Sequence, residues 1–111
     1  MIFIFGPLWS GKRAAAKELL GWNDAELSRR AVWDVQELAR ERTDLETLAE
    51  ELSRREVVIA TEVGGGIVPV EAAEREARER AGRLNCLLAE WADAVVRVFC
   101  GIPKLMKGSL P

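Results

Sequence analysis

MIFIFGPLWSGKRAAAKELL, residues 1–20, begins with an apolar run, passes through a loop bracketed by two glycines and ends in a helical pattern. The loop has the spacing G-x-x-x-x-G-K of a phosphate-binding P-loop. In such a loop, consecutive backbone N–H groups face one concavity and the N-terminus of the following helix lies behind them. The alternative is a loop that keeps only its turn geometry. The residues expected to bind a nucleotide are Gly6, Pro7, Leu8, Trp9, Ser10, Gly11, Lys12 and Arg13.

Two basic residues end this loop, and they have different expected roles. Lys12 is expected to be catalytic, reaching the β- and γ-phosphates of ATP or GTP as a point charge. Arg13 stands where the motif has a Ser or Thr hydroxyl that binds Mg²⁺. A guanidinium has five donors and no lone pair for a metal. Arg13 is therefore suited to phosphate, and a Mg²⁺ ion would need phosphates, water and an acid from elsewhere in the chain.

The composition indicates one globular domain. The chain has 111 residues, of which 49% are hydrophobic and 31% are charged, and we expect a single P-loop kinase-like domain over residues 1–111. The formal net charge is −2 and no block of Lys or Arg stands out, so no nucleic-acid partner is expected. No apolar run approaches the roughly 20 residues that span a bilayer, so no membrane partner is expected.

Cellular location and thiol chemistry follow from what the sequence lacks. The N-terminus has no basic region of the signal-peptide kind, so we expect a cytoplasmic protein. Cys86 and Cys100 are then expected to be reduced thiols of the core. The sequence contains no histidine, which removes the commonest general base and the commonest transition-metal ligand.

Apolar runs alternate with helical patterns along the chain. Gly21 is expected to end the first helix, and Asp24 to cap a short second one. This alternation predicts the α/β class, namely a small P-loop NTPase-like three-layer fold with a mainly parallel sheet of about four strands. The expected strands are residues 1–5, 31–35, 56–61 and 94–100; the expected helices are residues 14–20, 24–27, 36–42, 43–55 and 71–92, and a tail follows residue 100.

Acidic residues stand at the carboxyl ends of two of these strands. Glu62 stands directly after residues 56–61, where P-loop NTPases keep the carboxylate that holds the metal or its water. We expect Glu62 to be catalytic and to bind the metal, the alternative being a surface carboxylate. Asp34 is expected either in the substrate loop or as a cap of the following turn. Ligands of open α/β sheets bind at the carboxyl ends of the strands, so Lys12, Asp34 and Glu62 are expected to meet in one crevice.

Glycines and tryptophans complete the set of candidate residues. The glycines after Glu62 allow close approach of the backbone to a ligand. Trp9 either covers a ring of the ligand or packs, and Trp91 lies on the apolar stripe of residues 71–92 and is expected in the core. The expected substrate loop contains Gly64, Gly65, Gly66 and Pro69.

The second half of the chain resembles a known family. Residues 58–69, VIATEVGGGIVP, followed by GRLN at residues 82–85 and by Gly101-Ile102, are similar to the adenosylcobinamide kinase/adenosylcobinamide-phosphate guanylyltransferase family. The first strand and its loop resemble the family too, where a serine is usual at the position of Arg13. The resemblance covers residues 1–21 and 56–107 and leaves out the middle. It implies a P-loop fold, a homo-oligomer and a role in cobalamin biosynthesis.

The resemblance implies two reactions and two kinds of partner. One reaction phosphorylates a hydroxyl of adenosylcobinamide with a nucleoside triphosphate; the other transfers GMP from GTP through a histidine in the middle segment. Because the chain has no histidine, guanylyl transfer by that route is excluded. The chain looks like a short divergent relative, with a nucleotide and a corrinoid as implied partners. The alternative to a kinase-like phosphotransferase is a non-catalytic nucleotide- or corrinoid-binding protein, regulatory or structural, of a cobalamin pathway.

Overall fold

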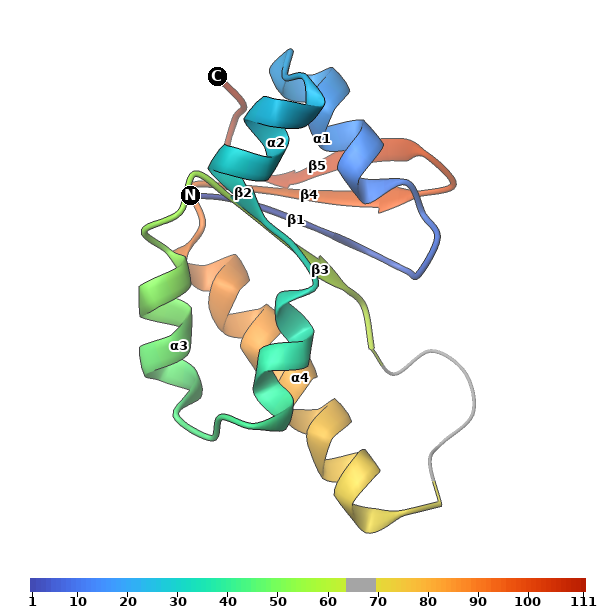
Figure 1. Ribbon diagram of the computed structural model, residues 1–111, viewed down its shortest axis with the longest axis vertical. Helices are drawn as coiled ribbons and strands as arrows, with labels where there is room; N and C mark the ends of the chain where they lie inside the picture. Colours follow the sequence, from blue (N-terminus) through green and yellow to red (C-terminus); the bar gives the residue numbers. More distant parts are fainter. Residues whose placement is uncertain (64–69) are drawn as a thin grey trace.

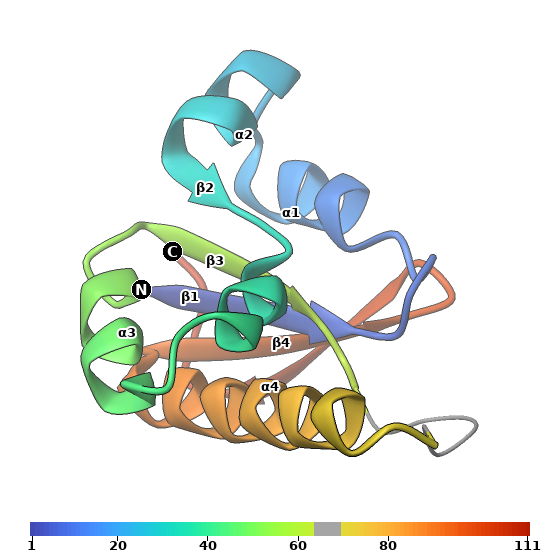
Figure 2. The same ribbon diagram turned by 60° about the horizontal axis from the view of Figure 1, so that its bottom comes forward.

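A five-stranded sheet lies between two layers of helices (Figures 1 and 2). The computed structural model describes residues 1–63 and 70–111. The elements in chain order are β1 (Ile2–Gly6), α1 (Lys12–Leu20), α2 (Asp24–Arg30), β2 (Ala31–Val32), the 3₁₀ helix η1 (Val35–Arg40), α3 (Leu45–Leu52), β3 (Val57–Thr61), α4 (Ala72–Trp91), β4 (Ala94–Phe99) and β5 (Ile102–Lys107).

The strand order across the sheet is β2-β3-β1-β4-β5. The first four strands in this order are parallel, and β5 runs antiparallel to β4. The α/β class with a mainly parallel sheet is therefore confirmed. In β1 and β3 nearly every residue is buried or partly buried, as expected for parallel strands covered on both faces.

The two faces of the sheet carry separate apolar clusters. Alternate residues of a strand point to opposite faces, so Phe3 packs with η1, α3 and α4, whereas Ile4 packs with α1 and α2. Figure 2 shows α1 and α2 on one side of the sheet and η1, α3 and α4 on the other. Among the described helices, none is long and apolar enough to cross a membrane.

The expected tail from residue 101 is a strand, which corrects the count of about four strands. Cys100 and Gly101 have φ angles of 52° and 74°, a left-handed pair that closes a tight turn between antiparallel strands. The chain therefore returns along β4, and Phe99 pairs with Ile102. All six residues of β5 are exposed, so β5 has no apolar alternation that would have predicted a strand.

Local boundaries differ from the expectations at two other places and agree at a third. Residues 31–35 form a strand only at Ala31–Val32, because η1 begins at Val35. Asn23, not Asp24, caps α2: its side chain accepts from the backbone N–H of Glu26, and Glu26 accepts in return from the backbone N–H of Asn23. Gly21 ends α1 in a left-handed conformation, as predicted.

The two cysteines are not core residues. Cys86 on α4 and Cys100 in the β4–β5 turn are both free and exposed. Cys86 lies off the buried stripe of α4, and Cys100 lies at the tip of a hairpin whose second strand is itself exposed. Their small apolar side chains were therefore a poor guide to burial.

Gly82 offers a test of how α4 packs. A Cβ added at Gly82 would have Val63 Cγ2 as its nearest neighbour, at the ordinary contact distance of 3.8 Å. Glycine inside a helix is less favourable than alanine by about 0.5–1 kcal/mol. We therefore expect Gly82→Ala to raise the free energy of unfolding by about 0.5–1 kcal/mol in urea denaturation. A loss of stability would show that α4 lies closer to its neighbours than described.

Candidate functional site

The loop of residues 6–13, here the N-terminal loop, connects β1 to α1 at the carboxyl edge of the parallel strands. Gly11 has a φ of 83° and directly precedes α1, so that Lys12 and Arg13 lie in the first turn of the helix. The backbone N–H of Ser10 donates to the carbonyl oxygen of Pro7 at 3.2 Å, and that of Gly101 donates to the carbonyl oxygen of Ser10 at 2.8 Å. The turn between β4 and β5 is therefore hydrogen-bonded to the N-terminal loop.

Unsatisfied donors gather at this loop. The first turn of α1 contains no acidic residue, and Gly11 provides no side-chain cap, so its first N–H groups keep their positive partial charge. Ser10 is buried, with 4% of the residue exposed. Its Oγ has no hydrogen-bond partner among the described residues. A buried hydroxyl without a partner is costly, and a bound anion would satisfy it.

Lys12 turns back onto the loop. Its Nζ donates to the carbonyl oxygen of Pro7 at 2.8 Å. Burial lowers the pKa of Lys12, while the charges of Asp34 and Glu62 raise it and that of Arg13 lowers it further. Of the three residues expected to meet in one crevice, Lys12 and Asp34 line the same cavity, whereas Glu62 is not among its lining residues.

The lowered pKa of Lys12 predicts a rise in stability at alkaline pH. Between this pKa and the ordinary value of 10.5, the unfolded chain binds more protons at Lys12 than the folded chain does. The contribution of Lys12 to the free energy of unfolding therefore increases as the pH rises through the lowered pKa, and it is lost as the pH falls again. Urea unfolding at several pH values should show this increase in the wild type relative to Lys12→Met. Parallel pH profiles would contradict it.

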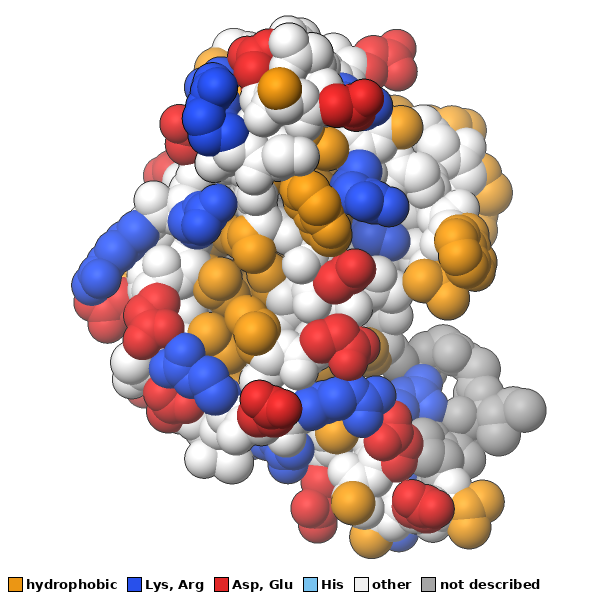
Figure 3. Space-filling view, viewed as in Figure 1, with side chains coloured by type: hydrophobic (Ala, Val, Ile, Leu, Met, Phe, Trp, Pro, Cys, Tyr) orange, Lys and Arg blue, Asp and Glu red, His pale blue; other side chains and the backbone are white. Residues whose placement is uncertain are grey.

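A cavity of about 510 Å³ opens beside the loop. On one side Arg13 lies over the ring of Trp33, with its Cζ 5.3 Å from the ring centre. Leu8 and Trp9 at the tip of the loop are 63% and 91% exposed. Figure 3 shows hydrophobic side chains gathered at the right edge, over this loop. The residues that line the cavity are Leu8, Trp9, Ser10, Gly11, Lys12, Arg13, Ala14, Trp33, Asp34, Ile59 and Thr61.

Glu62 is engaged by another residue. Its carboxylate accepts two hydrogen bonds from Arg97, from Nε to Oε1 at 2.5 Å and from Nη2 to Oε2 at 3.1 Å. Arg97 lies opposite Phe5, so the ion pair passes over β1, which separates β3 from β4. The pairing raises the pKa of Arg97. Thr61 lines the cavity, whereas Glu62, the next residue, binds Arg97.

Of the other residues predicted for the site, the structure describes Asp34 but not those of the glycine loop. Asp34 is exposed, has a φ of 57° and occupies the N-cap position of η1, but its side chain makes no capping hydrogen bond. It lines the same cavity as Lys12. The expected substrate-loop residues Gly64, Gly65, Gly66 and Pro69 lie outside the described residues.

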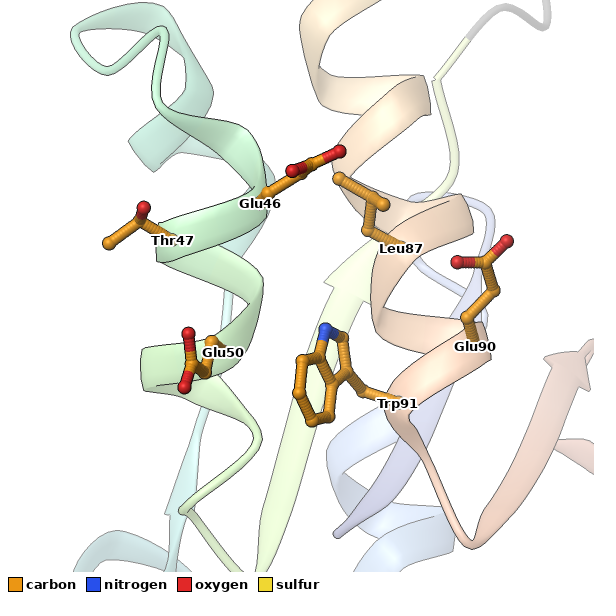
Figure 4. Close-up of a pocket in the computed structure, with 6 residues that line it drawn as sticks. All are labelled: Glu46, Thr47, Glu50, Leu87, Glu90 and Trp91. Carbon is orange, nitrogen blue, oxygen red and sulfur yellow. The ribbon is translucent and has the colours of Figure 1, made fainter.

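A second cavity, of about 540 Å³, lies between α3 and α4 and has an acidic lining. Figure 4 shows Glu46 on α3 directed toward Leu87 of α4, Glu50 one turn further along α3, and the indole of Trp91 lying between the two helices. Trp91 is 50% exposed, so the expectation that it belongs to the core is wrong. It stands on the last turn of α4 and faces the groove instead of the sheet. The carboxylates would repel phosphate, so this cavity is a poor nucleotide site.

Sequence reasoning missed two residues of the site. Arg97 is the single charged residue in β4, whose other members are apolar, and such an interruption was a usable signal. Trp33 was read as part of a longer strand, and its contact with Arg13 depends on the early end of β2. Neither contact follows from local spacing in the sequence.

Comparison with known proteins identifies the family. The family model described as cobinamide kinase / cobinamide phosphate guanyltransferase matches residues 21–106. The match extends through residues 22–55, which the resemblance left out, and it begins after the N-terminal loop and the whole of α1. No curated protein matches the sequence. Since the family model covers well over half of the chain, the protein belongs to the cobinamide kinase / cobinamide phosphate guanyltransferase family.

Proposed function

We propose that this protein binds the phosphates of ATP or GTP on the N-terminal loop and transfers a phosphoryl group to a corrinoid alcohol. The observation that carries the proposal is the loop itself. The hydroxyl of Ser10 is buried without a partner among the described residues, and Lys12, whose Nζ donates to the carbonyl oxygen of Pro7, begins a helix whose first turn has no acid. A bound anion would place negative charge near the hydroxyl, the Lys12 ammonium group and the positive end of α1. The family match supports a function related to that of cobinamide kinase in cobalamin biosynthesis.

The phosphoryl transfer itself assigns roles to three charged residues. The acceptor hydroxyl oxygen bonds to the γ-phosphorus, the bond to the bridging oxygen breaks and the nucleoside diphosphate leaves. Lys12 stabilises the charge on the phosphates. The hydroxyl proton passes to a carboxylate, for which Asp34 and Glu62 are the candidates. Guanylyl transfer through a histidine is not part of the proposal, because the sequence has no histidine.

A second candidate function is binding without turnover, in a regulatory or structural role. The observation that favours it is the pairing of Glu62 with Arg97, which occupies both oxygens of the acid expected to be catalytic. Self-association and a cytoplasmic location, both expected from the sequence, stay predictions.

The test combines binding with turnover. Calorimetric titration with ATP and with GTP, in Mg²⁺ and separately in EDTA, should detect binding by the wild type. Lys12→Ala is expected to weaken binding by about ten- to a hundredfold, because a charge-assisted hydrogen bond is lost. Lys17→Ala, on the same helix but paired with Asp24 at 2.7 Å, is the matched control and should bind like the wild type.

Turnover then separates the two candidates. Incubation with adenosylcobinamide and the nucleotide that binds should yield a phosphorylated corrinoid, detected by mass spectrometry. Binding without product would favour the second candidate. If neither nucleotide binds in either buffer, or if Lys12→Ala binds as well as Lys17→Ala, the N-terminal loop is not the nucleotide site and the proposal fails.

A further inference from the structure

Mg²⁺ accompanies nucleotides in most phosphoryl-transfer sites, and the residues of this site can be tested against its chemistry. The ion demands nearly octahedral coordination by oxygen, which proteins usually supply from one or two carboxylates alongside the phosphates of the substrate. In P-loops one further oxygen comes from the hydroxyl that follows the lysine. The fit therefore depends on residue 13 and on the acid at the end of β3.

Residue 13 does not offer an oxygen. It is an arginine, and its guanidinium lies over the ring of Trp33 at 5.3 Å. Stacking of this kind holds a cation in place by its attraction to the ring face. The position that normally coordinates the metal thus carries a fixed positive charge, which repels a divalent cation.

The acid that follows β3, Glu62, is already ion-paired. Arg97 donates to both carboxylate oxygens of Glu62, and its guanidinium also lies 5.5 Å from the ring centre of Phe99. A bidentate arginine–carboxylate pair is among the stronger and more directional polar contacts in proteins. Metal binding by Glu62 would require this pair to break and leave Arg97 beside the ion.

The remaining oxygen donors are few. Asp34 lines the cavity as an exposed carboxylate, and the two hydroxyl residues in the lining are Thr61 and Ser10, of which Ser10 is 4% exposed. Within residues 1–63 and 70–111, no group of three acidic, histidine or cysteine residues is arranged to hold a metal ion. The donor set is thus a poor match for Mg²⁺, while the cations Lys12 and Arg13 are well placed for phosphate.

We propose that the N-terminal loop binds nucleotide polyphosphate without Mg²⁺, with guanidinium groups in the place of the metal. Arg13 supplies positive charge beside Lys12, and Arg97 neutralises Glu62, which would otherwise repel the phosphates. The inference rests on the proposed nucleotide binding and narrows its ligand to the metal-free nucleotide. It also gives the pairing of Glu62 with Arg97 a role in binding.

The test compares the same calorimetric titration of the wild-type protein in EDTA and in excess Mg²⁺. Affinity for the nucleotide is expected to be equal or lower in Mg²⁺, because the metal neutralises the phosphates that the side chains bind. Tightening by Mg²⁺ of about threefold or more would overturn the inference and leave nucleotide binding intact; smaller tightening supports it. No binding in either buffer would instead be the failure of the proposed function.

Variants of the ion pair test the role of Arg97. Arg97→Met keeps a flexible apolar stem but lacks the guanidinium group and leaves Glu62 charged and unpaired, so affinity in EDTA should fall by about fivefold or more, and Mg²⁺ should restore part of it. Adding Glu62→Gln removes the carboxylate charge, and affinity in EDTA should return. If Arg97→Met binds like the wild type in both buffers, Arg97 has no part in binding. The wild-type comparison stands even where a variant fails to fold.

Discussion

Gly6→Ala is expected to lower the free energy of unfolding by about 3 kcal/mol, at the upper end of the usual cost of overpacking. Gly6 is the last residue of β1, where the chain enters the N-terminal loop. A Cβ at this position would lie 2.1 Å from the carbonyl oxygen of Val98 and 2.8 Å from Oγ of Ser10. The first of these is a backbone atom of the neighbouring strand, so β1 and β4 must separate before an alanine fits.

Urea denaturation measures this loss, and Gly21→Ala is the matched control. Gly21 also ends an element, but a Cβ there meets no atom within 4 Å, and its cost comes only from a φ of 69°. That cost is about 1–2 kcal/mol for a residue other than glycine. Should Gly6→Ala lose no more stability than Gly21→Ala, the close approach of β4 to the end of β1 is wrong.

Leu84→Ala is expected to lower the free energy of unfolding by about 3 kcal/mol, within the usual range for a buried leucine. Leu84 is 0% exposed and belongs to the cluster between α4 and the sheet that includes Phe3 and Val58. Ala77 and Ala81, which precede it on the buried stripe of α4, are too small to fill the cavity left by truncation.

The control for Leu84 is Leu38→Ala on η1, where the leucine is 42% exposed. Surface positions of this kind usually change stability by less than about 0.5 kcal/mol. Both variants are compared with the wild type by urea denaturation monitored by circular dichroism. Equal losses from the two substitutions would mean that α4 does not pack through Leu84.

The parts of the fold that were predictable from sequence are those determined by local pattern. β1 and β3 are short apolar runs that end at glycine or at an acid, and α1 follows a glycine-bracketed loop. β5 was missed because its residues are exposed and its pairing depends on the turn at Cys100–Gly101. Trp91 was misplaced because the helical stripe does not show which neighbour faces its last turn.

The residues of the candidate site also fall into those that local pattern predicts and those that it does not. The residues of the N-terminal loop follow one another in sequence, so their spacing alone predicted them. The partner of Glu62 depends on strand order, because Arg97 reaches it across β1 only when β3 and β4 flank that strand. A local pattern contains the acid and the arginine but not their proximity. Long-range pairs of this kind can be predicted only once the order of the strands in the sheet is known.

The hydrogen bond from Gly101 to Ser10 has a consequence for how this protein assembles. It joins a turn near one end of the described chain to a loop near the other, so forming it carries the entropic cost of closing nearly the whole polypeptide into a ring. Contacts of such sequence separation are slow to form. The pairing of β1 with β4 closes a similar length of chain, so the N-terminal loop should reach its final shape only as the sheet forms, and ligand recognition should lag behind the formation of the helices during refolding.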